Sequence, residues 1–329
     1  MNLELFGLIV FGLVFLVVGG EFLVRGASQL AAIIGIPPVV VGLTIVAFGT
    51  SAPELAVSLK AALGGNADIA VANVVGSNNF NVLFILGISA LVSPLIIHSQ
   101  MITREVPILI GASLLLGGMA YMGKNISPAE GALLAILIVA YTAWLVYEAL
   151  KNKKANQELI RESEQEFSAP KKGKGKAALI SLVYVVGGLA VIMFGADWLV
   201  KGAITLAKLL GVSDTVIGLT IVAAGTSLPE VVASVMATIK GERDIAVGNV
   251  VGSNIYNIFA ILGISGFIAP EGLNVSDSLL YFDIPVMILV SLIMWPIFKT
   301  GQRISRKEGA FFLISYVLYT LYLIVNAQA

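Results

Sequence analysis

The chain has 329 residues, of which 58% are hydrophobic and only 12% are charged, and it contains no cysteine. Because ordinary globular domains are about one quarter charged, this composition is typical of a protein embedded in a lipid bilayer. The missing cysteines exclude disulfides, thiolate catalysis and cysteine-ligated metals. The 20 basic residues balance the 20 acidic ones, so there is no net charge to attract nucleic acid.

Apolar segments of roughly 20 residues recur along the chain, long enough to cross a hydrocarbon core of about 30 Å as helices. Their continuous apolar character, rich in glycine, favours packed helices over the alternating strands of a membrane barrel. The first segment lacks a basic start and a clear cleavage site, so we interpret it as a spanning helix. We predict ten spanning helices, at residues 3–32, 38–62, 69–92, 104–122, 127–149, 177–208, 213–239, 245–268, 279–298 and 308–326.

A polar, lysine-rich linker at residues 151–176 divides the chain into a first half, residues 1–150, and a second half, residues 177–329. The halves match after a shift of 176 residues. GLTIVAFGTSAPELAVS at 42–58 aligns with GLTIVAAGTSLPEVVAS at 218–234, and IAVANVVGSNNFNV at 69–82 aligns with IAVGNVVGSNIYNI at 245–258. These gapless matches predict that a five-helix unit has been duplicated.

The positions of lysine and arginine predict the orientation in the membrane. The linker carries eight of them, and a second group lies at residues 299–307, so the positive-inside rule places both regions in the cytoplasm and both termini outside. Since each half has five spans, the halves would insert in opposite orientations, as in many secondary transporters. The predicted fold is an all-α integral membrane fold of ten transmembrane helices in two inverted-topology five-helix repeats, set in a prokaryotic inner (plasma) membrane.

Two glutamates lie within apolar segments, where a charge costs at least about 2.5–3.5 kcal/mol. Glu54 and Glu230 occupy the same position of a repeated GTSxPE motif. The prolines before them, Pro53 and Pro229, remove a backbone hydrogen bond and predict an unwound turn with free carbonyl oxygens. Inverted repeats would bring both carboxylates to a common point, which suits a divalent cation. The alternative is a pair of protonated, hydrogen-bonded acids that only hold the helices together.

Hydroxyl and amide oxygens accompany these carboxylates. Thr50 and Ser51 share a helix face with Glu54, and a second repeated motif, NVVGSNxxN, adds further oxygens. The resulting candidates are Glu54, Thr50, Ser51, Ser77 and Asn81, with Glu230, Thr226, Ser227, Ser253 and Asn257 at the matching positions. We interpret Asn73 and Asn249 as interhelical hydrogen-bonding residues. Hard oxygen donors without His or Cys favour Na⁺, Ca²⁺, Mg²⁺ or Mn²⁺.

These paired motifs resemble the two alpha-repeats of the sodium/calcium exchanger family, within the cation/calcium antiporter superfamily, and the resemblance spans essentially the whole chain. It implies that Glu54 and Glu230 bind calcium together with the Thr50 and Thr226 carbonyls. It also implies movement of the first and sixth helices across the rest. The sodium ligands that it implies are Ser51, Ser77, Ser227, Ser253 and the backbone carbonyls of Ala47 and Ala223.

The predicted function is a secondary antiporter that exchanges Ca²⁺ for Na⁺, with no cofactor. Several members of the superfamily carry Asp at the position of Asn257, and the neutral residue here keeps Ca²⁺/H⁺ exchange open as an alternative. A cation channel would use similar ligands but needs a continuous pore. An intramembrane enzyme would need a nucleophile or cofactor motif, and the sequence has none. The sequence leaves the oligomeric state open.

Three further charged positions carry predictions. Glu21 and Asp197 are repeat-related and lie four residues before Arg25 and Lys201, so we expect an ion pair within each helix. His98 is the single histidine, and we expect it to lie in a solvated loop.

Overall fold

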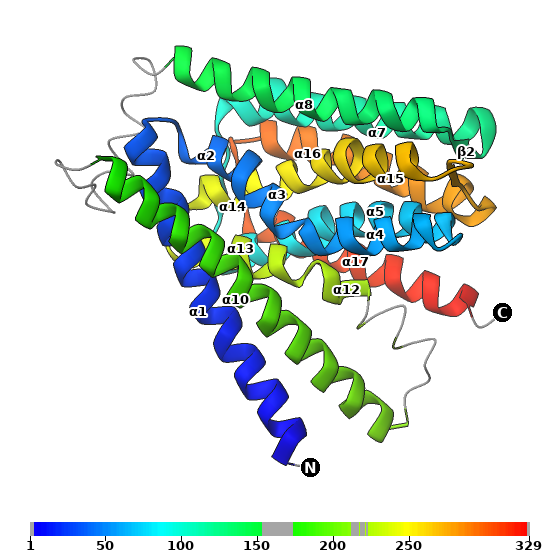
Figure 1. Ribbon diagram of the computed structural model, residues 1–329, viewed down its shortest axis with the longest axis horizontal. Helices are drawn as coiled ribbons and strands as arrows, with labels where there is room; N and C mark the ends of the chain where they lie inside the picture. The colour runs from blue at the N-terminus through cyan, green and yellow to red at the C-terminus, as the bar shows by residue number, and fades with distance from the viewer. Residues whose placement is uncertain (1–2, 153–173, 212–216, 218–220, 222, 328–329) are drawn as a thin grey trace.

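The computed structural model describes residues 3–152, 174–211, 217, 221 and 223–327, and these are almost entirely helical (Figure 1). The first half contains α1 (Leu3–Ile34), α2 (Pro38–Val41), η1 (Gly42–Val46), α3 (Ala47–Thr50), α4 (Ala52–Leu63), α5 (Ala67–Phe80), η2 (Asn81–Leu86), α6 (Gly87–Val92), η3 (Met101–Glu105), α7 (Val106–Gly123) and α8 (Pro128–Lys151). The second half contains α10 (Lys174–Leu209), α12 (Ala223–Thr226), α13 (Leu228–Ile239), α14 (Arg243–Tyr256), η5 (Asn257–Ile261), α15 (Leu262–Ile268), η6 (Leu279–Asp283), α16 (Ile284–Lys299) and α17 (Arg306–Ala327). The η segments are π-helical turns.

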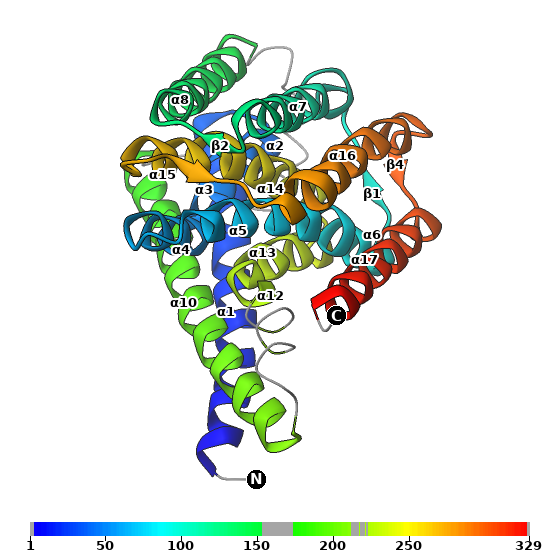
Figure 2. The same ribbon diagram turned by 90° about the vertical axis from the view of Figure 1, so that its right-hand side faces the viewer.

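Four short strands depart from the expectation of helices throughout. β1 (Leu95–Ile96) pairs antiparallel with β4 (Arg303–Ile304), and β2 (Asn125–Ile126) pairs antiparallel with β3 (Leu273–Asn274). Each pair joins a loop of the first half to a loop of the second (Figure 2). A two-residue strand is too short to show an alternating pattern, so the sequence gives no signal for it.

Eight helices in the described ranges are long and apolar enough to cross a membrane. The broken pair Pro38–Thr50 and Ala52–Leu63, bent by 45°, would make a ninth span. The predicted span 213–239 lies partly outside the described residues, and its described end is the apolar helix α13. The count of ten therefore stays a prediction. Residues 153–173 of the predicted linker also lie outside the described ranges.

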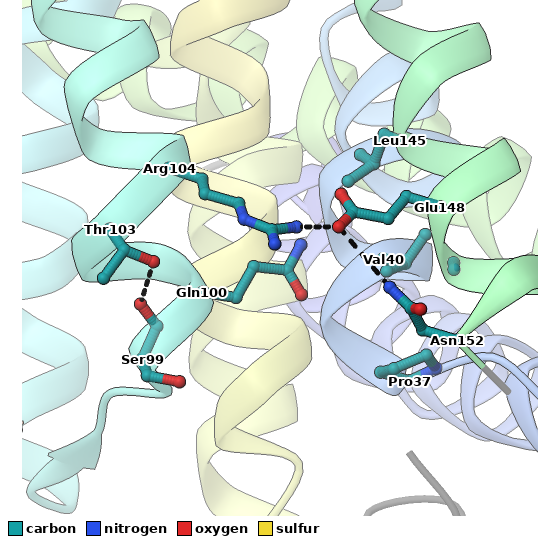
Figure 3. A pocket seen from close by; sticks show the side chains of 10 residues that line it. Pro37, Val40, Ser99, Gln100, Thr103, Arg104, Leu145, Glu148 and Asn152 are labelled. Carbon is teal, nitrogen blue, oxygen red and sulfur yellow. Dashed lines mark hydrogen bonds and ion pairs between the residues drawn. The ribbon is translucent and has the colours of Figure 1, made fainter. Parts of the chain in front are cut away.

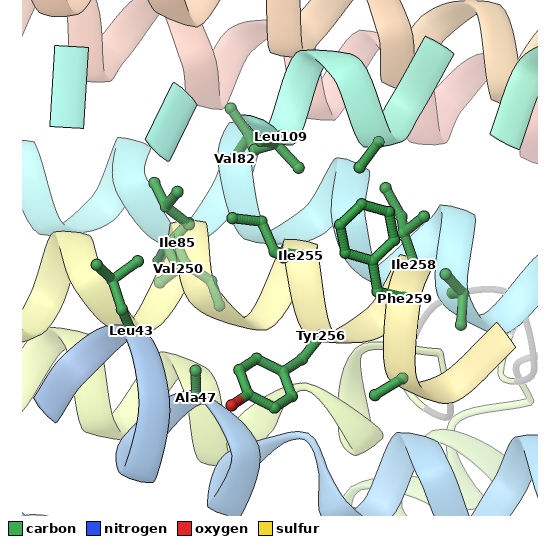
Figure 4. Close-up of a cluster of buried hydrophobic side chains, with 14 of the residues drawn as sticks. Leu43, Ala47, Val82, Ile85, Leu109, Val250, Ile255, Tyr256, Ile258 and Phe259 are labelled. Atoms are coloured by element: carbon green, nitrogen blue, oxygen red, sulfur yellow. The ribbon is translucent and has the colours of Figure 1, made fainter. Parts of the chain in front are cut away.

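The two helices that carry the NVVGSNxxN motif form the centre of the molecule. Residues 245–262, in the segment from α14 to α15, are all buried, and most of the segment from α5 to α6 is buried too. Figure 4 shows α14 packed between Ile85 of η2 on one side and Leu43 and Ala47 on the other. The close approach depends on glycine, because a Cβ atom at Gly252 would lie 2.8 Å from the Leu43 backbone.

The first helices of the two halves, α1 and α10, pack side by side and run obliquely across the other helices (Figures 1 and 2). Gly12 approaches Gly195, and Gly19 approaches Gly188, so numbers rise along one helix as they fall along the other and the pair is antiparallel. These glycines are seven residues apart in each helix, as expected where small residues let membrane helices meet closely. The outward faces carry exposed apolar side chains such as Phe11, which suits contact with lipid.

Candidate functional site

Both GTSxPE motifs lie at a helix break. In the first half α3 ends at Thr50, Ser51 has φ −79° and ψ 7°, and α4 begins at Ala52. Because Pro53 has no N–H, the carbonyl four residues earlier loses its usual partner. In the second half Ser227, with φ −88° and ψ 8°, separates α12 from α13 in the same way. These breaks confirm the unwound turns that the prolines predict.

The two breaks face each other, and each serine reaches the glutamate of the other half. Ser227 donates a hydrogen bond from Oγ to Glu54 Oε1 over 2.8 Å, and Ser51 donates to Glu230 Oε1 over 3.0 Å. Ser77 Oγ lies 3.1 Å from Ser227 Oγ. Both glutamates are fully buried. The structure therefore brings both carboxylates, both motif serines and Ser77 together, as the candidate ligand set requires.

The two asparagines of the second motif are held by the same kind of reciprocal contact. Asn81 donates from Nδ2 to Asn254 Oδ1 over 2.9 Å, and Asn257 donates to Asn78 Oδ1 over 3.0 Å. The side-chain nitrogens of Asn81 and Asn257 are therefore both used in hydrogen bonds to the other half, whereas their side-chain oxygens are not. Asn78 and Asn254 were not among the predicted site residues, although both belong to the repeated motif.

Four buried oxygens at these positions accept no hydrogen bond: Glu54 Oε2, Glu230 Oε2, Asn81 Oδ1 and Asn257 Oδ1. A buried acceptor without a partner costs about 1–3 kcal/mol, and carboxylate and amide oxygens are the ligands that hard cations prefer. Within the part of the chain that the structure describes, no group of three or more His, Cys, Asp or Glu side chains is placed to hold a metal. Neutral oxygens must therefore complete any site at the two glutamates.

The remaining predicted ligands lie around this centre. Thr50 is buried, with Oγ1 3.0 Å from Asn249 Oδ1 and 3.5 Å from Ser253 Oγ. The Ala47 carbonyl accepts the Ser51 amide over 3.1 Å and lies 3.3 Å from Thr50 Oγ1, so as a sodium ligand it would exchange the hydroxyl contact for the ion. Thr226 is half-buried at the end of α12, the short helix that begins at Ala223.

Asn73 and Asn249 make the interhelical hydrogen bonds that we expected. Asn73 donates to the Glu54 carbonyl and to Ser58 Oγ, and Asn249 donates to the Glu230 carbonyl and to Ser234 Oγ. They tie the helix after each break to its neighbour and thereby fix the position of each glutamate. Asn249 also accepts a hydrogen bond from a candidate ligand, Thr50.

The predictions for the other charged residues had mixed outcomes. Asp197 pairs with Lys201 over 2.7 Å, as expected. The prediction for Glu21 was wrong, because its carboxylate pairs with Lys240, the residue that follows α13, over 2.5 Å. A rule based on spacing within one helix misses a neighbour from another helix. His98 is half-buried and lies 2.9 Å from Asp244, so it is not simply a solvated loop residue.

A hollow of about 250 Å³ opens against the two breaks. It is lined by Pro53, Met193, Ala196, Asp197, Val200, Gly225, Thr226 and Pro229. The residues before both glutamates thus form its floor, and α10 forms its wall. The hollow thus reaches the helix breaks that carry the two buried carboxylates.

A separate polar hollow of about 200 Å³ lies where α2, η3 and α8 meet (Figure 3). Its charged groups are already paired with one another. Arg104 forms an ion pair with Glu148, and Asn152 donates to the same carboxylate over 3.4 Å. It therefore has no free charge for a transported ion.

Comparison with known proteins finds matches that cover both halves of the chain. The family model for the sodium/calcium exchanger protein matches residues 4–147 and 180–325, one segment in each half. A putative antiporter, CaxA, from Alkalimonas amylolytica is 39% identical over 94% of this chain and 95% of its own length. The sodium/calcium exchanger MaX1 from Methanosarcina acetivorans is 38% identical over 97% of this chain and 98% of its own length.

Solved structures of the sodium-calcium exchanger NCX_Mj have a similar fold. One, soaked with Na⁺ and Ca²⁺, has a TM-score of 0.80 and 28% sequence identity, and the match covers 97% of this chain and 98% of that one. Another, soaked without either ion, has a TM-score of 0.82.

Proposed function

Because the chain belongs to the sodium/calcium exchanger family, a family of membrane transporters and not of enzymes, we propose that it is a secondary antiporter that exchanges Ca²⁺ for Na⁺. One observation carries the proposal: the four unpartnered, fully buried oxygens of Glu54, Glu230, Asn81 and Asn257, beside two facing helix breaks. Two carboxylates balance one Ca²⁺, two Na⁺ or two protons. Competition of these ions for one set of oxygens is the physical basis of exchange.

The two halves form inverted five-helix repeats of a ten-helix protein, with both termini outside and the linker in the cytoplasm. The antiparallel packing of α1 against α10 supports this arrangement, since these are the matching first helices of the halves. The reciprocal bonds support it too, because Ser227 to Glu54 repeats as Ser51 to Glu230. Contacts that repeat when the halves are exchanged are the mark of a twofold relation.

Exchange proceeds by alternating access, with α1 and α10 moving across the other helices. The unequal surroundings of the two helices support this step. Asp197 of α10 lines the open hollow. At the matching place on α1, Glu21 is tied to Lys240, and a Cβ atom at Gly20 would lie 2.7 Å from Met236. One side is therefore open and the other is packed, as expected for one of two states.

Ca²⁺/H⁺ exchange through the same glutamates is the second candidate, and the neutral Asn257 favours it. With only two carboxylates, two protons discharge the site as fully as two Na⁺. The similarity to MaX1, a sodium/calcium exchanger, supports sodium instead.

The test is ⁴⁵Ca²⁺ uptake by proteoliposomes under an imposed Na⁺ gradient, an imposed pH gradient, or neither. We expect the Na⁺ gradient to drive uptake and lower pH to reduce it, because protons compete for both carboxylates. Glu54→Gln and Glu230→Gln should each lower uptake by roughly a hundredfold or more, since each leaves one negative charge against Ca²⁺. Uptake driven only by the pH gradient would select the second candidate. Uptake that neither gradient drives, or that both variants retain, would contradict the proposal, and currents far above transporter turnover would indicate a channel.

A further inference from the structure

A second pair of buried acids recurs in the two halves, away from the GTSxPE motifs. Glu105 is followed by Val-Pro and Asp283 by Ile-Pro, and each acid ends a π-helical turn, η3 or η6. Each accepts a hydrogen bond of 2.6 Å from a tyrosine 36 residues later, Tyr141 for Glu105 and Tyr319 for Asp283. Equal spacing and equal bond length show that the duplication preserved this pair as well.

The two pairs differ in one respect. Asn79 of α5 joins the Asp283 pair: its Nδ2 lies 3.3 Å from Tyr319 Oη and 3.4 Å from the Asp283 carbonyl oxygen. The residue at the matching position of α14 is Ile255, which has no polar atom in its side chain. Only the Asp283 pair is therefore hydrogen-bonded to a helix that carries site residues. Asn79 is fully buried, and its Oδ1 has no partner.

Asn79 stands beside the residues that shape the cation site. Its neighbour Asn78 accepts the hydrogen bond that orients Asn257, and Asn81 follows two residues later. Asn78 Nδ2 also lies 3.6 Å from the sulfur of Met287, one turn after Asp283. Hence α5 is held at two consecutive residues by the segment from η6 to α16, immediately before the π-helical turn that begins at Asn81.

We propose that Asp283, Tyr319 and Asn79 are positioning residues for the cation site, and that they fix the rotation of α5 so that Asn78 keeps its hydrogen bond with Asn257 and Asn81 keeps its hydrogen bond with Asn254. Consecutive residues of a helix point about 100° apart, so contacts at both Asn78 and Asn79 prevent the helix from turning. Groups that orient ligands without touching the ion are known to control affinity strongly. The inference rests on the proposed function of the glutamates.

The experiment compares Tyr319→Phe with Tyr141→Phe. Each variant removes a tyrosine hydroxyl that donates to a buried acid, Asp283 in the second half and Glu105 in the first. Calcium uptake is measured over a range of calcium concentrations, with calcium-induced thermal stabilisation in detergent as a second readout. For Tyr319→Phe we expect a roughly tenfold rise in KM, the size of one lost hydrogen bond, with maximal flux within about twofold of wild type. For Tyr141→Phe we expect a KM change below about twofold. The calcium-induced stabilisation should weaken in Tyr319→Phe alone.

Variants of Asp283 distinguish a role in positioning the cation site from a role that only holds the helices together. Asp283→Asn keeps an oxygen that accepts from Tyr319, so it should raise KM less than Asp283→Leu does. Equal KM values for the two tyrosine variants, or an equal loss of thermal stability without a KM change, would overturn the proposal. If Tyr319→Phe fails to fold, the order of KM in Asp283→Asn and Asp283→Leu decides it. Wild type and Glu54→Gln in the same liposomes test the proposed function separately, because their difference does not involve Asp283.

Discussion

The antiparallel contact between α1 and α10 should depend on the absence of a single methyl group. A Cβ atom at Gly19 would lie 2.8 Å from the Gly188 carbonyl oxygen and from the Ile192 amide nitrogen. The helices would have to separate by about 0.6 Å for these contacts to reach the ordinary 3.4 Å. Overpacking of this kind costs about 1–3 kcal/mol, whereas alanine in place of glycine gains about 1 kcal/mol of helix propensity. Gly19→Ala should therefore destabilise the protein by a net 0 to about 2 kcal/mol, which is about 1–3 kcal/mol worse than alanine at an uncrowded glycine of the same helix.

Gly7→Ala is the matched control on the same helix, because its Cβ atom would meet nothing nearer than the Phe11 ring at 3.9 Å. This variant should be neutral or stabilised by up to about 1 kcal/mol. The assay is the midpoint of thermal unfolding in detergent for wild type and both variants. Gly188→Ala, whose Cβ atom would lie 2.6 Å from the Leu23 amide nitrogen, should behave like Gly19→Ala. Equal midpoints for Gly19→Ala and Gly7→Ala would refute the packing argument.

Two further predictions concern residues outside the carboxylate pair. Asn249→Leu should lower stability by about 1–3 kcal/mol, because leucine removes the hydrogen bonds of this buried amide to the Glu230 carbonyl, Ser234 and Thr50; chemical denaturation measures the loss, and an unchanged free energy of unfolding would contradict it. In a loop, the hydrogen bond and charge of Asp277 raise the pKa of Lys124. The pair therefore stabilises the folded state at pH values below the ordinary lysine pKa. This stabilisation is lost as the pH rises through the raised pKa. Asp277→Asn should lower that pKa, which makes acylation of Lys124 faster at alkaline pH, and an unchanged rate would argue against the pairing.

The centre of the candidate site could be predicted from the sequence because duplication makes it visible. Glu54 and Glu230 stand out as charges in apolar segments, and the prolines beside them predict the breaks that the structure contains. The predicted inverted repeats would bring them together, and this expectation needs no knowledge of side-chain packing. The serine contacts across the halves follow from the same relation.

Features that depend on a partner from another helix could not be read in this way. The spacing rule for ion pairs considers one helix alone, so it assigned Glu21 to Arg25 and missed Lys240. The role of Asn78 depends on which amide faces it in the folded protein, and no periodicity encodes that. The acid and tyrosine pairs are different, because the equal separation of 36 residues in both halves was available as a signal.

In the proposed alternating-access cycle, the differences between the two halves would let the protein favour one state. If the repeats were identical, the state that is open beside α10 and packed beside α1 would have the same energy as the state with these two sides exchanged. Lys240 holds Glu21, but the residue at its matching position in the first half is Gly64, and Asp197 instead pairs within its own helix. A partly exposed ion pair contributes about 0–1 kcal/mol, enough to shift a two-state population several-fold. Such a bias is small enough for ion binding to reverse, as the proposed exchange requires.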